Sequence, residues 1–397
     1  PGCSFPSKSL AGVGVMFYVL TALRAELRDR EWFERCGLAM PNLGDALDLV
    51  ALGTVADVVP LDRNNRILVA AGLARIRAGR GRPGIDALLE IAGRSASELS
   101  SSDLGFILGP RLNAAGRLED MAIGIECLLA ESAFAARPLA QQLDDLNRER
   151  RDIEANMQEE ALAQLSTVEV DDEALKFGLC VYNKSFHQGV VGIVAARLRE
   201  RYHRPTIVFA EAGNDELKGS GRSIPGVHIR DVLDHVATTH PDLIGKFGGH
   251  AMAAGLSLHH KDLNQFQEAF NTAVALALEH VPPEPVVMTD GELAVEELNL
   301  NNAEAIAAAG PWGQHFPEPI FEGSFVLVDQ RLLKDKHLKL TLEAEGENFE
   351  AIAFNVDREC WPNDQVARVR IAYQPDINSY RGERRLQLMI RHLWPES

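Results

Sequence analysis

Two glycine-flanked segments carry the side chains best suited to bind an anion. In Gly219-Ser-Gly-Arg-Ser-Ile-Pro-Gly226, a short polar loop, hydroxyl groups and a guanidinium could converge on a phosphate. In Lys246-Phe-Gly-Gly-His250, two glycines free the backbone beside the histidine, just before small residues that we expect to form a helix. The N-terminus of that helix would attract an anion. A hairpin turn and a structural histidine are the respective alternatives, and neither segment has Walker or Rossmann spacing.

Two further segments combine glycine with basic side chains. Phe186-His-Gln-Gly-Val-Val-Gly192 places a histidine and a glycine ahead of a predicted helix. Gly109-Pro-Arg-Leu-Asn-Ala-Ala-Gly-Arg117 holds two arginines and an asparagine among small residues, which allow a bulky ligand close to the backbone. Guanidinium groups match phosphate oxygens in a bidentate manner. Phosphate binding is one interpretation of these segments, and solvated arginines on a turn or a helix face are the other.

Asp57 is the polar exception in an apolar run from Leu47 to Pro60. A buried carboxylate must be hydrogen-bonded, paired or bound to a metal. A helix cap or a partner for Arg66 is the alternative to a metal ligand. One carboxylate cannot by itself hold Mg²⁺ or Mn²⁺, which take about six mostly oxygen ligands. The residues alone therefore leave the role of Asp57 open.

Composition limits the classes of protein that the chain can belong to. The 397 residues suffice for two or three domains, and 40 basic against 57 acidic side chains give a net charge of −17. Any anionic substrate must therefore meet local positive clusters. The longest apolar stretch, Gly12 to Leu23, is too short to span a membrane, and the five cysteines are too scattered for a disulfide framework. We expect a cytoplasmic protein without a membrane segment, and a chain that begins with Pro1 is expected to be part of a longer one.

The sequence of the first half of the chain predicts helices within an α/β layer. Apolar spacing predicts a buried helix from Leu10 to Leu27, and the run from Leu47 to Pro60 fits a buried strand or a helix end. Short helices then alternate with glycine-rich turns through Ala133, which is typical of the second half of an α/β layer. A long helix from Pro138 to about Ser166, with proline in its first turn, is expected to join two domains.

The second half predicts another α/β domain and a small barrel. A strand from Gly178 to Tyr182, a helix from Val190 to Arg201 and a strand from Thr206 to Ala210 indicate the α/β domain. Beyond the boundary at His280 to Pro285, five segments alternate apolar and polar residues, as the strands of a small barrel do: Phe321 to Gln330, His337 to Glu343, Phe349 to Asn355, Val366 to Gln374 and Arg385 to Leu393. Aromatic and basic residues of the barrel could stack bases beside a basic groove, unless they serve ordinary packing: Tyr373, Tyr380, Arg381, Arg384 and Arg385.

Taken together and in this order, the motifs resemble the RecJ family of single-strand-specific bacterial exonucleases, within the DHH phosphoesterase superfamily. The resemblance rests on the four segments above, on Leu49-Val-Ala-Leu-Gly-Thr-Val-Ala-Asp-Val-Val-Pro-Leu61 and on Gly310-Pro-Trp-Gly-Gln-His-Phe-Pro-Glu-Pro319. It implies an α/β chain with four parts: the remainder of a DHH domain with a parallel sheet (1–137), a connecting helix (138–170), a DHHA1 domain (171–283) and an OB-fold barrel (284–397). The family's Asp-x-Asp and Asp-His-His motifs, which supply most metal ligands, are absent from this sequence.

The resemblance also implies roles for individual residues. Asp57 matches a metal-binding aspartate for Mn²⁺ or Mg²⁺, and His250 matches a catalytic loop that faces the metals. The implied contacts to the DNA strand come from residues of several segments: Arg111, Asn113, Arg117, His187, Ser220, Arg222, Ser223, Gly248, Gly249, Tyr380 and Arg381.

By resemblance, the intact protein is expected to be a hydrolase that degrades single-stranded DNA from its 5′ end in repair and recombination. A single-strand-binding protein, recombination or mismatch-repair proteins and the missing N-terminal part of the same protein are implied partners. The chain alone is expected to bind DNA without cutting it. A DHH phosphodiesterase of short oligonucleotides or cyclic dinucleotides is one alternative, and a DNA-binding subunit without catalysis is another.

Overall fold

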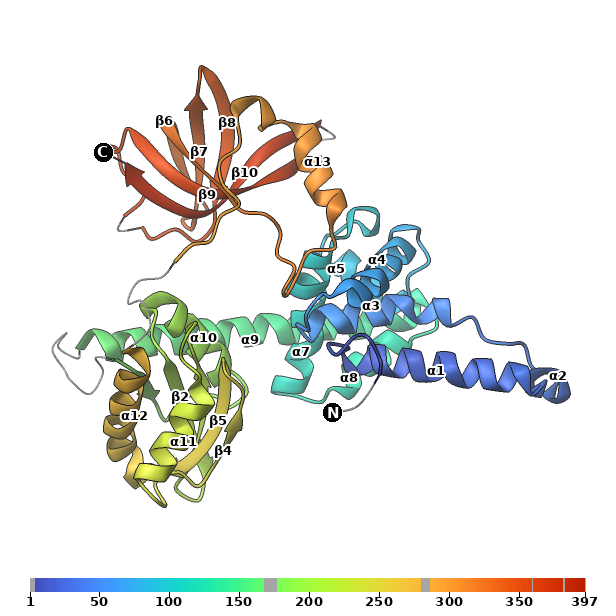
Figure 1. Cartoon of the computed structure of the whole chain (residues 1–397), viewed down its shortest axis with the longest axis horizontal. Helices are drawn as coiled ribbons and strands as arrows, with labels where there is room; N and C mark the ends of the chain where they lie inside the picture. Colours follow the sequence, from blue (N-terminus) through green and yellow to red (C-terminus); the bar gives the residue numbers. More distant parts are fainter. Residues whose placement is uncertain (1–3, 168–176, 280–285, 359, 381–382, 397) are drawn as a thin grey trace. The chain divides into compact units, whose positions relative to one another are not determined.

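The computed structural model describes residues 4–167, 177–279, 286–358, 360–380 and 383–396. The chain divides into two compact units, one of residues 1–110, 128–136 and 287–397 and the other of residues 111–127 and 137–286. Among the described residues, no helix is both long enough and apolar enough to cross a membrane. The elements of each unit are coloured along the chain in Figure 1.

All the regular secondary structure among the described residues of the first part of the chain is helical. Its helices are α1 (Gly12–Asp29), α2 (Trp32–Cys36), α3 (Leu47–Ala56), α4 (Arg63–Arg77), α5 (Pro83–Ile91) and α6 (Ser101–Asp103), followed by a π-helical turn at Leu104–Leu108, α7 (Gly109–Leu118) and α8 (Ala122–Leu129). The apolar run from Leu47 thus forms a helix rather than a strand. The parallel sheet expected in this part is not found among residues 4–136, and the α/β character of the chain comes from later elements.

The helices α3 and α4 of this part pack against each other in close contact. A Cβ added at Gly72 of α4 would lie 2.2 Å from the carbonyl oxygen of Leu47, so only glycine lets the two helices touch there. Asp62 caps α4 by accepting a hydrogen bond from the Asn65 amide at 2.9 Å. The buried carboxylate of Asp48 accepts one from the Arg82 amide at 3.0 Å, where α5 begins.

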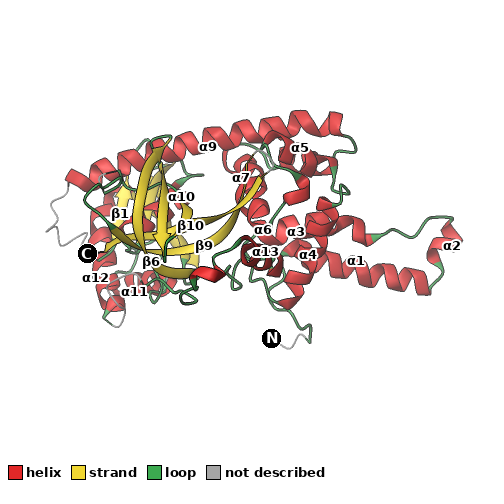
Figure 2. Cartoon of the chain, turned by 90° about the horizontal axis from the view of Figure 1, so that it is seen from above, coloured by secondary structure: helices red, strands yellow, loops and turns green. Residues whose placement is uncertain are grey.

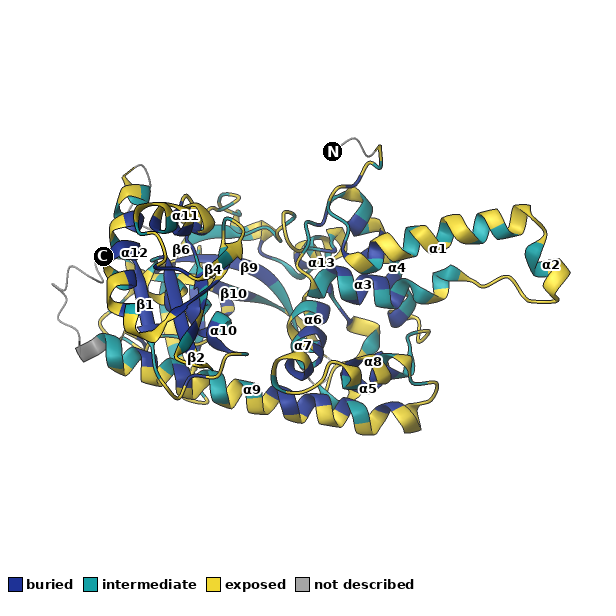
Figure 3. Ribbon diagram, turned by 90° about the horizontal axis from the view of Figure 1, so that it is seen from below, coloured by how far each residue is buried: buried dark blue, intermediate teal, exposed yellow. Residues whose placement is uncertain are grey.

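The helix α1 departs from the sequence prediction in its burial. Its extent agrees, but of its residues only Gly14 is buried, and several large apolar side chains are exposed: Val15, Met16, Val19, Leu20 and Leu23. Figure 3 shows α1 largely in the colours of exposed and intermediate residues. The prediction of a buried helix was wrong because apolar spacing identifies a face without specifying what covers it.

The five predicted barrel strands are confirmed. They are β6 (Phe321–Leu333), β7 (His337–Ala344), β8 (Glu347–Ala353), β9 (Arg368–Tyr380) and β10 (Glu383–Glu396), and they close in the order β10-β8-β7-β6-β9. Alternate residues of each strand fill the interior, which in β7 are Leu338, Leu340 and Leu342. The helix α13 (Leu300–Ala309) precedes the barrel and contacts β9 and β10.

The segment before the barrel packs on the helices of the same unit. Trp312 and Phe316 stack with ring centroids 4.8 Å apart, and the guanidinium carbon of Arg66 lies 3.7 Å above the Phe316 ring. The Leu61 amide donates a hydrogen bond to the Gln314 carbonyl at 2.7 Å. These contacts attach the chain that leads into the barrel to the helix α4 and to the loop before it.

The connecting helix α9 runs from Ala133 to Thr167, and Figure 2 shows it as one continuous helix. It begins five residues before the predicted start, because Ser132 accepts a hydrogen bond from the Ala135 amide at 3.3 Å and acts as the cap. Pro138 therefore lies inside the helix rather than at its first position. Residues 168–170 of the predicted helix lie outside the described residues.

A five-stranded sheet forms the centre of the second unit, in the order β1-β2-β3-β5-β4. The strands are β1 (Leu179–Tyr182), β2 (Thr206–Gly213), β3 (Glu216–Arg222), β4 (Lys246–Gly249) and β5 (Ala253–His259). One face packs on α11 (Ile229–Thr239) and α12 (Leu263–Leu278), and the other packs on α10 (Val191–Tyr202) and the second half of α9. The predicted strand, helix, strand order at 178–210 is confirmed.

Two of the predicted anion-binding segments lie on strands of this sheet. Gly219 to Arg222 belong to β3, which pairs with β2 and β5, and Gly248 and Gly249 belong to β4. The segment after His250 is a turn and then β5, so the helix predicted there was wrong. Small residues occur here because strands and side chains approach closely: a Cβ added at Gly219 would lie 2.5 Å from the Phe209 ring.

Candidate functional site

The strand β3 sorts its side chains onto two faces of the sheet. Gly219 and Gly221 lie against the core on the α11 and α12 side. Because side chains alternate along a strand, Lys218, Ser220 and Arg222 lie on the opposite face, beside α10. A Cβ added at Gly192 of α10 would lie 2.9 Å from both Ser220 Oγ and Arg222 Nη2. The predicted segments around Gly192 and Gly219 therefore meet in the structure.

A row of small residues extends this face toward the edge strand. Ser220 pairs with Gly255 of β5, which in turn pairs with Gly248 of β4. A Cβ at Gly248 would meet nothing within 4 Å, and one at Gly255 would meet only the Gly219 carbonyl oxygen at 3.9 Å. Lys218 and Lys246, both exposed, pair with Ser257 on the same face. An extended backbone could thus approach this strip closely, between basic side chains.

The N-terminus of α10 lies against this face at Gly192, and its Val191 and Ile193 amides donate to the carbonyls of His187 and Val190. Val190 occupies the N-cap and makes no side-chain cap hydrogen bond. The preceding loop is tightly packed, because a Cβ at Gly189 would lie 2.4 Å from the carbonyl oxygen of Arg117. The guanidinium of Arg117 donates a hydrogen bond to the Gly189 carbonyl at 3.0 Å. The helix dipole favours a negative ligand at such an end.

The charge around Arg222 is uncompensated. Its guanidinium donates to Ser220 Oγ at 3.1 Å and to the Gly221 carbonyl at 2.8 Å, both neutral acceptors. Burial lowers the pKa of Arg222, and repulsion from Arg117 and Arg199 lowers it further. Within the described part of the chain, neither Arg222 nor Arg117 has a carboxylate partner. A cation that is half-buried among other cations is suited to receive an anion.

The remaining predicted residues of this unit differ in how far they are free to bind. His250, in the turn after β4, and His187, before α10, are exposed; the Nδ1 of His187 accepts a hydrogen bond from the Gly189 amide at 3.1 Å. Gly249 has a φ of 151°, and a Cβ there would lie 2.4 Å from the Ala253 carbonyl, so glycine is required for the turn. Ser223 is buried and donates its hydroxyl to the Val227 carbonyl at 2.6 Å, which commits that group to the fold.

The helix α7 carries the other predicted contacts. Asn113 is exposed, whereas the guanidinium of Arg111 donates to the buried Asp144 of α9 at 2.8 and 2.9 Å. Arg111 therefore helps to hold α7 on α9. Sequence alone did not separate these residues, because the ion pair joins positions that lie 33 residues apart.

Asp57 lies in the other unit, at the C-cap of α3, and its side chain is exposed rather than buried. Arg66, the alternative partner, lies over Phe316 instead. Val58 follows with a φ of 56°, a left-handed conformation that is rare for a β-branched residue and costs about 1–3 kcal/mol. Such strain gathers at functional sites.

The metal implied by the family resemblance is not accommodated by the residues described here. They include no group of three or more His, Cys, Asp or Glu side chains that could hold a metal ion. One exposed carboxylate does not provide the roughly six ligands of Mg²⁺ or Mn²⁺. The described residues therefore do not form a metal centre by themselves.

The aromatic and basic residues predicted in the barrel serve mostly other purposes. Tyr373 is fully buried in the barrel core, and burial raises its pKa well above the ordinary value. Arg384 and Arg385 form ion pairs with Glu304 at 2.8 Å and with Glu383 at 2.5 Å, respectively. The side chain of Tyr380 and all of Arg381 lie outside the described residues. Sequence reasoning missed the exposed Trp394 of β10, which stacks on His392.

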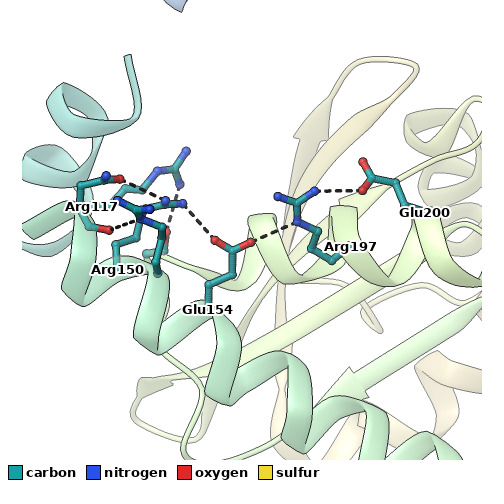
Figure 4. A network of polar contacts seen from close by, with 8 residues as sticks. Arg117, Arg150, Glu154, Arg197 and Glu200 are labelled. Atoms are coloured by element: carbon teal, nitrogen blue, oxygen red, sulfur yellow. Dashed lines mark hydrogen bonds and ion pairs between the residues drawn. The ribbon is translucent and has the colours of Figure 1, made fainter. Parts of the chain in front are cut away.

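A partly buried polar network was also missed (Figure 4). Arg150 and Glu154 of α9 pair at 3.1 Å, and Glu154 also accepts a hydrogen bond from Arg197 of α10 at 3.2 Å. Arg197 further pairs with Glu200 at 3.2 Å. The only signal in the sequence is the i,i+4 spacing of Arg150 and Glu154, which is common on exposed helices.

Comparisons with known proteins agree on one family. The profile described as the DHHA1 domain matches residues 176–276, and that described as the RecJ OB domain matches residues 289–392. The single-stranded-DNA-specific exonuclease RecJ of Dickeya dadantii is 56% identical over 395 residues, which cover 99% of this chain and 69% of that protein.

Solved structures of similar proteins carry the metals that the resemblance implied. RecJ from Thermus thermophilus in complex with Mg²⁺ matches with a TM-score of 0.78 at 28% identity, over 99% of this chain and 57% of that one. Its complex with Mn²⁺ matches with a TM-score of 0.73 at 29% identity, over 92% and 52%. This chain thus spans little more than half the length of these solved relatives.

Proposed function

Because the chain belongs to the RecJ family of single-stranded-DNA-specific exonucleases, we propose that it supplies the surface that grips a single DNA strand for hydrolysis from the 5′ end. The phosphodiester bond of the terminal nucleotide would be cleaved, so that the whole protein acts as an exodeoxyribonuclease in repair and recombination.

One observation supports this proposal most directly. Ser220, Arg222 and the first turn of α10 lie together, and the cation among them has only neutral acceptors. Phosphate oxygens are the natural ligands of such a group, because charge-assisted hydrogen bonds are about twice as strong as neutral ones. We assign this cluster to the 5′ phosphate or to the first backbone phosphate.

The neighbouring face would guide the rest of the strand. The open row at Gly255 and Gly248 would let the sugar–phosphate backbone lie flat, with Lys218 and Lys246 as cations alongside it. Arg117 would complete the phosphate cluster, while Asn113, His187 and His250 would contact the strand from the surrounding turns and from α7. We leave out Ser223, whose hydroxyl is committed to Val227.

Asp57 would provide one carboxylate oxygen for the Mn²⁺ or Mg²⁺ of the intact enzyme. Because the described residues hold no ligand cluster, we propose that the other ligands come from the part of the family's length that this chain does not span. The chain alone would then bind single strands without degrading them. We further propose that the barrel holds the strand downstream, with Tyr380 and Arg381 at its surface.

The finer assignments of cell location, partners and domain boundaries are also proposals. We propose that the protein acts in the cytoplasm of a bacterium, where a DNA substrate would be available. A single-strand-binding protein and recombination or mismatch-repair proteins are the partners suggested by the family. The division into residues 1–137, 138–170, 171–283 and 284–397 follows the same resemblance. The RecJ OB domain match argues against a phosphodiesterase limited to dinucleotides, because such an enzyme has no use for a downstream grip.

The test uses the purified chain with a 3′-labelled single strand that carries a 5′ phosphate. We expect binding, a strong decrease of affinity with salt, and no shortening of the strand in Mn²⁺ or Mg²⁺. A duplex of the same sequence is the control, and it should bind more weakly. Failure to bind the single strand would contradict the proposed surface, and efficient degradation would contradict the proposal that ligands are missing.

A further inference from the structure

The network in Figure 4 joins two helices of the second unit through a single carboxylate. The two oxygens of Glu154 on α9 are shared between Arg150 of the same helix, at 3.1 Å, and Arg197 of α10, at 3.2 Å. The side chains of Glu154 and Arg150 are only 12% and 13% exposed. Solvent therefore screens this pair less than it screens an ordinary surface ion pair.

Without Glu154, this part of the unit would hold an excess of positive charge. Burial lowers the pKa of Arg150, and repulsion from Arg151, Arg117 and Arg197 lowers it further, while Glu154 opposes the shift. The pKa of Arg197 is raised despite its burial, because Glu154 and Glu200 both accept from it. Glu154 thus allows two guanidiniums to lie close together.

The position of α10 links this network to the phosphate cluster. Arg197 follows Gly192 by five residues, or about 7.5 Å along the helix axis. A Cβ added at Gly192 would lie 2.9 Å from both Ser220 Oγ and Arg222 Nη2, and the loop before it is held by Arg117. A contact that fixes Arg197 on α9 therefore also fixes where the first turn of α10 lies against β3.

We infer that Glu154 is a positioning residue of the phosphate cluster: by pairing Arg150 with Arg197 it sets the place of α10, and it leaves Arg117 and Arg222 without a carboxylate so that they can bind the strand. The inference rests on the proposed function for the identity of the ligand. It deepens that proposal by naming a residue that acts on binding without touching DNA.

The test compares Glu154→Gln with Glu159→Gln in the full chain. Both changes remove one negative charge from α9, and Glu159 is exposed and has no ion pair within the described part of the chain. If the two variants differed from the original chain only in overall charge, both should bind a 5′-phosphorylated single strand slightly more tightly. Positioning predicts that Glu154→Gln binds about fivefold more weakly, within the range of couplings inside one network.

Two further readouts separate positioning from general destabilisation. Hydrogen exchange of the amides at residues 190–194 should quicken in Glu154→Gln and stay unchanged in Glu159→Gln. In an Arg222→Met background, Glu154→Gln should lose most of its effect on binding, because the two act on one site. Global melting temperatures are measured alongside for all variants.

The outcomes distinguish the inference from the proposed function. If Glu154→Gln binds as tightly as Glu159→Gln, or if exchange at residues 190–194 does not change, the positioning role is wrong. If the unmodified chain fails to bind the strand, the proposed function is wrong, and the exchange comparison still decides whether Glu154 fixes α10. Weaker binding together with faster local exchange supports both.

Discussion

Arg222→Met tests the phosphate cluster most directly, since it removes the charge and keeps an apolar stem of similar length. Losing one hydrogen bond between a charged group and the strand should cost about 1.5–3 kcal/mol of binding free energy. The dissociation constant should therefore rise roughly 10- to 150-fold. The plot of log K against log salt should become shallower by about 0.7, the value for one phosphate of a single strand.

Stability should respond differently from binding. The variant loses hydrogen bonds to Ser220 Oγ and to the Gly221 carbonyl, each worth about 1 kcal/mol. It also relieves the burial and the repulsion that lower the pKa of Arg222. Because these effects oppose each other, we expect the free energy of unfolding to change by less than about 1 kcal/mol.

The assay is fluorescence anisotropy of a 3′-labelled strand at several salt concentrations, with thermal unfolding of the same samples. Arg230→Met is the control, because it makes the same charge change at an exposed position of α11. Equal losses of affinity in the two variants would show that overall charge, and not this cluster, binds the strand. A fall in melting temperature that accompanies the loss would also refute the reasoning.

Four other substitutions have defined outcomes. Gly189→Ala should destabilise by about 1–3 kcal/mol in chemical denaturation, since its Cβ would lie 2.4 Å from a backbone oxygen, whereas Gly248→Ala, with open space around it, should leave stability unchanged and weaken strand binding. Arg66→Ala should remove about 1–2 kcal/mol of interaction free energy with the Phe316 ring, and this loss should appear as faster proteolysis of the segment before the barrel. Burial raises the pKa of Asp376 above its ordinary 3.8, so its carboxyl reduces stability as pH rises through the folded pKa; Asp376→Asn should raise the melting temperature at pH 7 and leave it unchanged near pH 3.

The elements that the sequence predicted correctly include those whose apolar residues recur at a regular, unbroken spacing along the chain. Leu338, Leu340 and Leu342 alternate with polar residues, and the strand they predict is present. The helix α10 was predicted to within one residue of each end, because a glycine-rich loop precedes it and a proline follows at 205. Local chemistry sufficed in both cases.

The strand β3 could not be predicted in this way. Gly219 and Gly221 occupy its core positions, so the apolar half of the alternation is missing from the sequence. The apolar contacts come from Phe209 and Leu256 on neighbouring strands, which fill the space above Gly219. A polar, glycine-rich segment therefore resembled a loop.

The network around Glu154 was hidden for another reason. Glu154 and Arg197 lie 43 residues apart, and nothing in either local pattern indicates that they meet. The exposure of α1 could not be predicted either, because the spacing of apolar residues shows which side of a helix is apolar and not what packs against it. Tertiary packing decided each of these features.

The row of small residues at Ser220, Gly255 and Gly248 limits how far the surface could distinguish one DNA sequence from another. In the proposed cluster, hydroxyl and guanidinium groups would bind phosphate oxygens, which are the same at every nucleotide, and a row without side chains offers nothing to a base edge. A surface of this kind cannot discriminate adenine from cytosine. Under the proposed function, such a surface would hold strands of any sequence with similar affinity.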